Sequence, residues 1–185
     1  MRRLAYLFLL VAGVLLAGLP AAARQDDPRL TELFAELKTA TSSLEVKVVE
    51  ARIWDIWTKH GDPRIDALMA RGADALSIED FDTALAAYNE VVKRDDGFAE
   101  GFNKRATVEY LRGDYAASVA DIERTLALEP RHFGALAGLG EIYLKLKRKE
   151  AALKAFEAAL KINPHLKGAQ AHVKELKDEL EGNPT

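Results

Sequence analysis

The chain has 185 residues, of which 49% are hydrophobic and 30% are charged, a composition typical of a folded globular protein rather than a disordered one. Its net charge of -3 gives no reason to expect a nucleic-acid partner. The absence of cysteine excludes disulfides, thiolate metal sites, a cysteine nucleophile and the lipid-bearing cysteine of a lipoprotein.

The first residues carry the pattern of a secretory signal peptide. A basic head over residues 1–3 precedes an uncharged apolar run over residues 4–19, and a stretch of small residues ends at Ala23. This order of segments predicts a signal peptide over residues 1–23, with cleavage after Ala23 and a short linker over residues 24–30. The alternative is an uncleaved leader that anchors the chain, although the run is shorter than the ~20 residues that span a bilayer.

The next segment, residues 31–64, is predicted to form a helical hairpin, with helices near residues 28–40 and 43–60. Its two tryptophans, Trp54 and Trp57, are expected in the core of this hairpin, because tryptophan is highly buried on average. Stacking of the same two rings on a ligand is the alternative.

Residues 65–166 repeat themselves with a period of 34 residues. Gly72, Ala106 and Gly140 are small residues at this spacing. Three further series keep the same spacing: Ala84, Ser118 and Ala152; Tyr88, Ile122 and Phe156; and Asp96, Pro130 and Pro164. Self-similarity at a fixed period of this length is typical of stacked repeats, here over residues 65–98, 99–132 and 133–166.

Each repeat is predicted to be a helical hairpin. Leu136, Gly140 and Tyr143 fall at i, i+4 and i+7, which places them on one face of a first helix. Asp80 and Asp114 precede the second helix of their repeats, where a carboxylate can accept hydrogen bonds from free backbone N–H groups.

Gly140 needs an explanation, because a glycine inside a helix costs about 1 kcal/mol relative to alanine. Small residues at Gly140 and Ala152 would let the two helix backbones approach closely, with Phe156 filling the space above the crossing. We expect a bulky side chain at either small position to force the hairpin apart, at a cost of about 1–3 kcal/mol.

This pattern resembles the tetratricopeptide repeat (TPR) signature, carried by Leu136, Leu139, Gly140, Tyr143, Ala152, Phe156, Ala159 and Pro164. The resemblance implies an all-α fold, a right-handed solenoid of antiparallel helical hairpins, with TPR 1 over residues 65–98, TPR 2 over 99–132 and TPR 3 over 133–166. The chain departs from the signature in three places. Glu109 replaces an aromatic residue, Thr125 replaces a small apolar one, and Arg148 replaces the turn aspartate.

Two segments flank the predicted repeats. Residues 31–64 are interpreted as a degenerate N-terminal hairpin, either a degenerate repeat or a capping hairpin, in which Lys38 and Glu50 occupy the positions of the small residues. Residues 167–181 are predicted to form a C-terminal capping helix, which a solenoid needs at its end, and residues 182–185 a frayed tail. The apolar stripe of the capping helix is expected to be Ala171, Val173, Leu176 and Leu180.

No catalytic or metal-binding pattern is present in the sequence. It contains no His-Glu-x-x-His or Gly-x-Ser-x-Gly motif, and zinc-ligand spacing is absent from its four histidines, His60, His132, His165 and His172. We therefore expect a protein that is not an enzyme and that holds no cofactor and no metal.

The resemblance implies a binding groove, because TPR proteins bind peptides or protein segments along the first helices of their repeats. The family register places these residues on that groove: Met69, Ala73, Leu76, Asn103, Lys104, Arg105, Thr107, Tyr110, Ala137, Glu141, Leu144 and Lys145. Some family members clamp a C-terminal carboxylate with lysine and asparagine. Only Asn103 and Lys104 match part of that pattern, and Glu141 would repel a carboxylate, so this specialised role is not expected.

Several alternatives remain at the level of the sequence. Asn103, Arg105 and His132 could form a cluster that serves a small-molecule or enzymatic accessory role. The basic run over residues 145–149 is expected to complement the dipole at a helix C-terminus, with an acidic partner as the alternative. Self-association through the end helix after Gly168 is a further possibility.

Together these features predict an exported, non-enzymatic TPR module that binds a protein or peptide partner, whose identity the sequence does not give. Export follows from the leader. A bacterial periplasm, and a role as a scaffold or adaptor in the cell envelope, follow from the resemblance to periplasmic TPR proteins. Contact with a membrane is expected only if the leader is retained.

Overall fold

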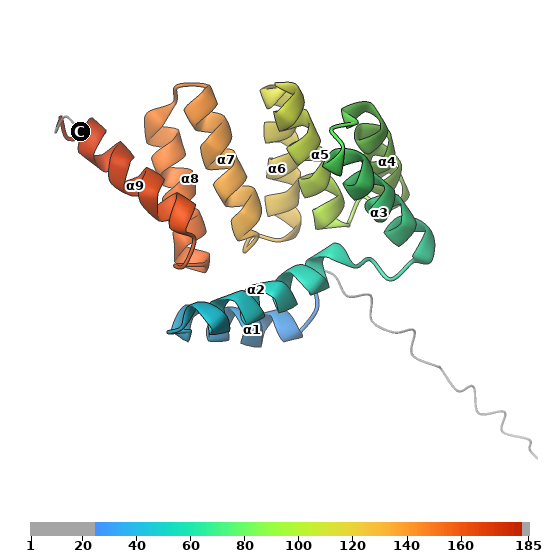
Figure 1. Ribbon diagram of the computed structural model, residues 1–185, viewed down its shortest axis with the longest axis horizontal. Helices are drawn as coiled ribbons and strands as arrows, with labels where there is room; N and C mark the ends of the chain where they lie inside the picture. Colours follow the sequence, from blue (N-terminus) through green and yellow to red (C-terminus); the bar gives the residue numbers. More distant parts are fainter. Residues whose placement is uncertain (1–24, 183–185) are drawn as a thin grey trace, which may run out of the picture.

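The computed structural model describes residues 25–182, which contain nine α-helices and no strand (Figure 1). The predicted signal peptide, its cleavage after Ala23 and residues 183–185 lie outside this range. The helices are α1 (Arg29–Thr39), α2 (Ser43–Thr58), α3 (Pro63–Ser77), α4 (Phe81–Arg94), α5 (Ala99–Arg112), α6 (Tyr115–Leu128), α7 (Phe133–Lys145), α8 (Lys149–Ile162) and α9 (Lys167–Leu180). Between residues 25 and 182, none of these helices has the length and apolar character needed to cross a membrane.

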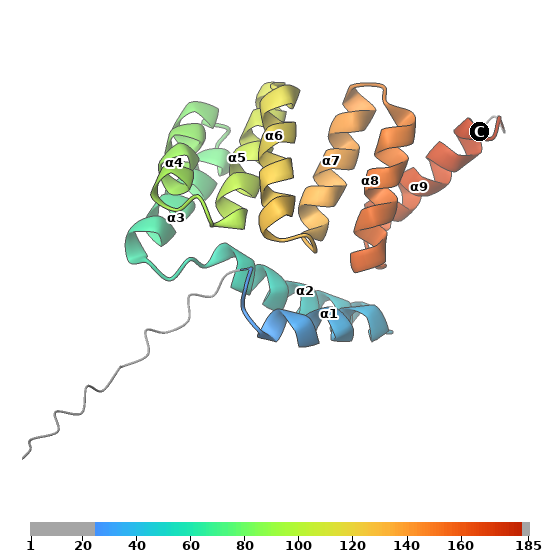
Figure 2. The ribbon, with the colours of Figure 1, turned by 180° about the vertical axis from the view of Figure 1, so that it is seen from behind.

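The three predicted hairpins are α3–α4, α5–α6 and α7–α8, and they stand side by side with α9 at the end of the row (Figures 1 and 2). Neighbouring helices contact each other from α3 through to α9. The first helices α5, α7 and α9 begin at Ala99, Phe133 and Lys167, at the 34-residue period. The predicted all-α solenoid is therefore confirmed, and α9 occupies the place of the first helix of a further repeat.

The turns inside the hairpins follow the predicted capping. The carboxylates of Asp80 and Asp114 accept hydrogen bonds from the backbone N–H of Thr83 and Ala117 at 3.1 and 3.2 Å. Arg148, which replaces the third aspartate, makes no side-chain cap. An uncapped helix start lacks an interaction that is worth about 1 kcal/mol.

The small helix residues have the predicted packing role. A Cβ atom on Gly140 would lie 2.6 Å from the ring of Phe156, and one on Gly72 would lie 2.5 Å from the ring of Tyr88. Real Cβ atoms essentially never come this close to another heavy atom. Both rings are buried, so the two glycines allow each aromatic side chain to lie directly on the backbone of the paired helix.

The predicted N-terminal hairpin forms as α1 and α2, but it does not continue the stack of repeats. It lies along the edge formed by the loops between successive repeats, at the bottom of Figure 1. Leu33, Leu37 and Ile53 share a buried cluster with Phe133, at the start of α7, and the partly buried Leu166, just before α9, packs against this cluster. The hairpin buries its apolar face against this edge, so it is neither a further repeat in the row nor a cap at its end (Figure 1).

Three polar contacts join the N-terminal segment to two of the inter-repeat loops, the one before α5 and the one before α9. His165 Nε2 donates to the carbonyl oxygen of Leu37 at 2.9 Å, and Asn163 Nδ2 donates to Glu50 Oε1 at 2.6 Å. His60 Nε2 lies 2.7 Å from Asp95 Oδ2. Glu50 therefore has a docking role at a position where the repeat signature requires a small residue.

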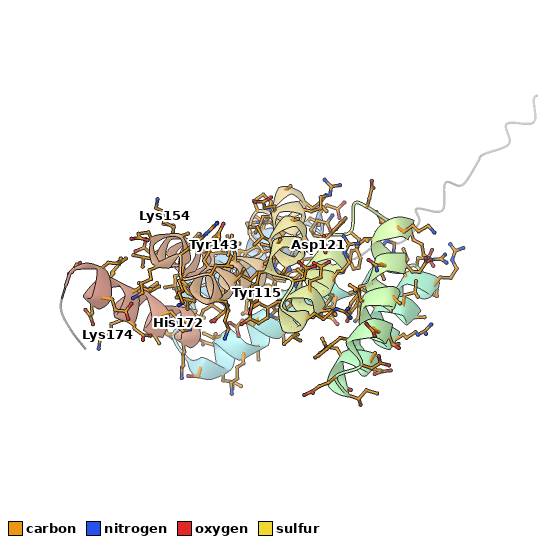
Figure 3. The ribbon with its side chains drawn as sticks, turned by 90° about the horizontal axis from the view of Figure 1, so that it is seen from above. Tyr115, Asp121, Tyr143, Lys154, His172 and Lys174 are labelled. Carbon is orange, nitrogen blue, oxygen red and sulfur yellow. The ribbon has the colours of Figure 1, made fainter. Side chains whose placement is uncertain are left out.

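The predicted apolar stripe of α9 is only partly confirmed. Leu176 is buried together with Ala169, whereas Ala171 and Leu180 are exposed. Seen from above, His172 of α9 lies beside the neighbouring helices (Figure 3). Its ring stacks on Phe156 at a centroid distance of 4.9 Å.

Candidate functional site

A pocket of about 150 Å³ opens between the first helices of the second and third repeats, α5 and α7. Its walls and floor are formed by Asn103, Ala106, Thr107, Tyr110, Ser118, Ile122, Gly134, Ala135, Gly138, Glu141 and Ile142. Of the predicted groove residues, Asn103, Thr107, Tyr110 and Glu141 thus meet at one place.

The floor of the pocket is apolar and its polar groups are already bonded. Ala106, Ile122, Ala135 and Ile142 form one buried cluster. Ser118, also at the floor, donates its hydroxyl to the backbone carbonyl of Ala106 at 2.7 Å. A side chain that entered the pocket would therefore meet mainly carbon atoms, with polar groups confined to the rim.

Gly138 keeps this pocket open, and no internal packing contact requires a glycine at this position. The nearest atom to a Cβ atom built on Gly138 is Ile122 Cδ1 at 3.8 Å, an ordinary van der Waals distance. By contrast, a Cβ atom on Gly134 would lie 2.7 Å from the ring of Trp54. A helical glycine costs about 1 kcal/mol relative to alanine, and at Gly138 no intramolecular contact accounts for that cost.

The N-terminal hairpin contributes a wall next to the pocket. Trp54 of α2 packs on Gly134, and its ring makes edge contacts with His132 at 5.5 Å and with Phe133 at 5.6 Å between centroids. Lys104 Nζ lies 5.8 Å from the centre of the Trp54 ring. Trp57 is fully buried against the ring of His132, so both tryptophans serve packing between the hairpin and the repeats.

A buried polar network underlies the rim at Asn103. Glu100 and His132 are 1% and 0% exposed, and His132 Nε2 lies 2.9 Å from Glu100 Oε2. The backbone N–H of Ala135 donates to His132 Nδ1 at 3.0 Å, so the ring proton lies on Nε2 and is donated to Glu100. Asn103 Nδ2 donates to the same carboxylate at 3.0 Å, which fixes the orientation of its amide.

Lys104 completes this network. Its Nζ lies 3.2 Å from Glu100 Oε1. Burial raises the pKa of the Glu100 carboxyl, but the hydrogen bond from His132 and the charge of Lys104 outweigh burial and hold the pKa below its ordinary value. Glu100 is therefore a carboxylate at neutral pH, and Lys104 is committed to it rather than to a ligand.

Arg105 does not face the groove, contrary to its predicted place there. Its guanidinium binds Asp121 of α6 through two hydrogen bonds of 2.6 and 2.7 Å and Asn89 of α4 at 3.0 Å. The proposed cluster of Asn103, Arg105 and His132 is therefore not assembled. Asn103 and His132 meet through Glu100, whereas Arg105 ties α5 to its two neighbouring helices.

Glu109 lies close to this ion pair, at the position where the repeat signature has an aromatic residue. Burial and the negative charge of Asp121 raise the pKa of Glu109 to about 7. The second hairpin thus places two carboxyl groups, those of Glu109 and Asp121, near the guanidinium of Arg105.

The remaining predicted groove residues lie outside the pocket. Met69 is buried in the core of the first hairpin, and Leu76 packs against the same core. Leu144 packs in the cluster between α7, α8 and α9, Ala137 is half-buried, and Ala73 and Lys145 are exposed. The family register therefore identified the correct helices, but it assigned the core residues Met69, Leu76 and Leu144 to the groove surface.

Sequence reasoning missed the residues that shape the pocket, above all Gly134 and Gly138. These two glycines lie four residues apart on α7, and both line the pocket. That spacing was visible in the sequence as a signal. Trp54 carried no such signal, because its contact with Gly134 joins residues 80 positions apart. Within residues 25–182 no group of three or more potential ligands is placed to hold a metal ion.

Comparison with known proteins agrees with this architecture. A family model for the tetratricopeptide repeat matches residues 69–121 and 103–166. A TPR repeat-containing protein of Rhizobium etli is 34% identical over 164 residues, which cover 89% of this chain and 80% of that protein. The family that matches is a repeat rather than a catalytic domain.

Solved structures show the same fold at low sequence identity. The first TPR domain of Spaghetti (RPAP3), bound to an HSP90 peptide, has a TM-score of 0.61 at 19% identity, covering 64% of this chain and 94% of that chain. MamA has a TM-score of 0.60 at 18% identity, covering 78% of this chain and 88% of that chain. By its repeats, its helix order and these matches, the chain belongs to the tetratricopeptide repeat family.

Proposed function

We propose that this protein is a non-enzymatic interaction module that binds an extended segment of a partner protein along its first helices. The pocket between α5 and α7 would hold one bulky apolar side chain of that segment. The observation that carries the proposal is Gly138, a helical glycine that leaves space at the pocket and has no packing partner that demands it.

The size and lining of the pocket indicate the class of side chain. An engineered apolar cavity of about 150 Å³ binds benzene, so a pocket of that volume suits a phenylalanine or leucine side chain. At the rim, Asn103 uses its amide nitrogen on Glu100 and keeps its oxygen as an acceptor for a backbone N–H of the bound segment. The apolar floor would supply affinity and the rim would supply orientation.

The groove does not suit a C-terminal carboxylate. Glu141 lines the pocket, and its carboxylate lies 3.1 Å from His172 Nε2. Lys104, the cation nearest to Asn103 in sequence, is engaged by Glu100 and the ring of Trp54. We therefore expect an internal segment of the partner rather than its C-terminus, in contrast to the chaperone-docking members of the family.

We also propose that the protein is exported to the envelope of a bacterium, where it would act as a scaffold or adaptor. The support is the leader pattern over residues 1–23 together with the similarity to a protein of Rhizobium etli. Mass spectrometry of the mature N-terminus in the native organism tests this step. An N-terminus at Arg24 supports export with cleavage, whereas one at Met1 supports an anchored scaffold.

The binding proposal is tested with peptides, because the partner is unidentified. Random peptides displayed on phage are selected on the wild-type protein, and the affinities of the selected peptides are measured by calorimetry. Gly138→Leu fills the pocket and should weaken binding by about tenfold or more. Gly168→Leu is the matched control, because Gly168 is exposed on α9 and has no atom within 4 Å of its Cβ position.

Two results would count against the proposal. The first is a set of selected peptides with no shared bulky apolar residue. The second is equal affinity of the selected peptides for the wild type and for Gly138→Leu, provided that both proteins show the same helicity.

A further inference from the structure

The three turns inside the hairpins form one edge of the molecule, which we call the turn edge. It consists of residues 77–82, 111–116 and 145–150, at the top of Figure 1, and it lies opposite the edge covered by α1 and α2. The binding pocket uses the first helices and not this edge, so the turn edge has no part in the proposed function.

The turn edge carries a row of exposed apolar side chains. Ile78 is 76% exposed, Leu111 is 48% exposed and Leu146 is 40% exposed, one from each hairpin. They account for three of the six large hydrophobic residues that are strongly exposed within residues 25–182. Single exposed leucines are common on protein surfaces, but here one recurs at nearly the same position of every repeat.

The charges on the turn edge change sign from one end to the other. Glu79, Asp80 and Asp82 give the first turn a charge of -3. In the middle turn Arg112 and Asp114 cancel. In the last turn four cations outweigh Glu150, which leaves a charge of +3, and these cations are Lys145, Lys147, Arg148 and Lys149. All of these charged residues are exposed.

Internal contacts account for only part of this pattern. Asp82 pairs with Arg112, and Lys149 pairs with Glu179 at 2.9 Å. Only Lys145 lies at the C-terminus of a helix, where a cation is favoured, whereas Lys149 begins α8, where it is not. The predicted explanation of the basic run by the helix dipole therefore covers one residue of the four.

We infer that the turn edge is a self-association surface, on which two copies of this chain pair antiparallel about a two-fold axis near Leu111. This arrangement places Leu111 against the partner's Leu111 and Ile78 against the partner's Leu146. It also brings the -3 turn of each copy against the +3 turn of the other, so the same complementary contact occurs twice. Such self-complementarity is what a two-fold interface requires.

The charge gradient favours a second copy over other occupants. An anionic membrane or an acidic protein would be attracted to the last turn but repelled by Glu79 and Asp80 of the first. Because the edge is narrow, the dimer should be weak, with a dissociation constant on the order of micromolar or above. The contact should also weaken as salt screens the two charge-matched ends.

A charge-swap experiment tests the pairing. One variant, Lys147→Glu with Arg148→Glu, makes both ends of the edge acidic, and a second, Glu79→Lys with Asp82→Lys, removes the acidic end. We expect each variant alone to dissociate about tenfold more readily than the wild type or worse. An equal mixture of the two variants should recover wild-type association, because both contacts of the mixed dimer are complementary again.

The measurement is sedimentation velocity across a wide range of concentration, on the protein in its native processed form. Lys38→Glu with Lys47→Glu is the matched control, because it changes the net charge as much as the acidic variant does but lies on the exposed surface of α1 and α2. Wild-type dimers, monomeric single variants and a restored mixture support the inference. A monomeric wild type, or a mixture that associates no better than its components, overturns it. So does a wild type that binds anionic lipid vesicles through Lys147 and Arg148 without self-association.

Discussion

The interior of the third hairpin and the pocket between α5 and α7 both lie against α7, but they use its glycines in opposite ways. Gly140 faces Phe156, which would collide with a Cβ atom at 2.6 Å. Gly138, two residues earlier, faces the pocket, where a Cβ atom would meet nothing closer than 3.8 Å. Gly140 is therefore required by the packing of Phe156, whereas no packing contact requires Gly138, which lines the pocket that we propose as the binding site.

The substitution Phe156→Ala, in the interior of the third hairpin, should have the largest effect on stability. The ring is 1% exposed and lies between the backbone of α7 and the ring of His172. Removing it leaves a cavity, so the free energy of unfolding should fall by about 3–5 kcal/mol. Chemical denaturation measures this loss, and a loss below about 1 kcal/mol would show that the third hairpin does not depend on this contact.

Arg105→Ala should be the next largest in effect and should act on stability alone. The substitution leaves the Asp121 side chain, 8% exposed, without its guanidinium partner. Breaking such a pair costs about 3 kcal/mol. Because Arg105 faces Asp121 and Asn89 rather than the pocket, peptide affinity should be unchanged in the folded variant. A loss of peptide affinity in a variant that remains folded would show that Arg105 takes part in binding after all.

Alanine at the two glycines of α7 should give shifts of opposite sign. Gly140→Ala should lower the free energy of unfolding by about 1–3 kcal/mol, because Phe156 must move. Gly138→Ala should raise it by about 0.5–1 kcal/mol, because alanine is the better helix former and meets no obstacle. Thermal and chemical unfolding of both variants give the comparison. A shift of the same sign in both would remove the distinction between core and pocket.

A smaller effect should appear as a pH dependence that belongs to the second hairpin. The pKa of Glu109 is raised from 4.5 to about 7, so the folded state binds more protons than the unfolded state between these values. Its contribution to stability is therefore fully present below pH 4.5 and is lost as the pH rises through about 7. Glu109→Gln should flatten this part of the stability profile relative to the wild type. An unchanged profile would show that another group titrates there.

The sequence was sufficient for the repeats, because their determinants are local. Helix periodicity, the caps Asp80 and Asp114 and the small residue Gly140 all act within one hairpin. The structure places each of them as predicted. The family register placed Arg105 correctly on α5 but did not predict the direction of its side chain. That direction is set by the ion pair with Asp121, which depends on how α6 packs.

The pocket and the N-terminal hairpin were less predictable, because they depend on contacts between distant residues. His165 reaches Leu37 across 128 positions, and Asn163 reaches Glu50 across 113. Periodicity cannot reveal where a hairpin docks when its own small positions are filled by Lys38 and Glu50. The docking position of this hairpin depends on the shape of the edge formed by the inter-repeat loops, and that edge exists only once the repeats have stacked.

The proposed role of the pocket is tested most directly by measuring both the stability and the peptide affinity of Gly138→Ala, using peptides selected on the wild type. We expect this variant to unfold at a higher denaturant concentration than the wild type and to bind the peptides more weakly, since the added methyl group improves the helix and occupies the pocket. A variant that is more stable and binds with unchanged affinity would contradict the claim that the pocket between α5 and α7 holds the partner's side chain.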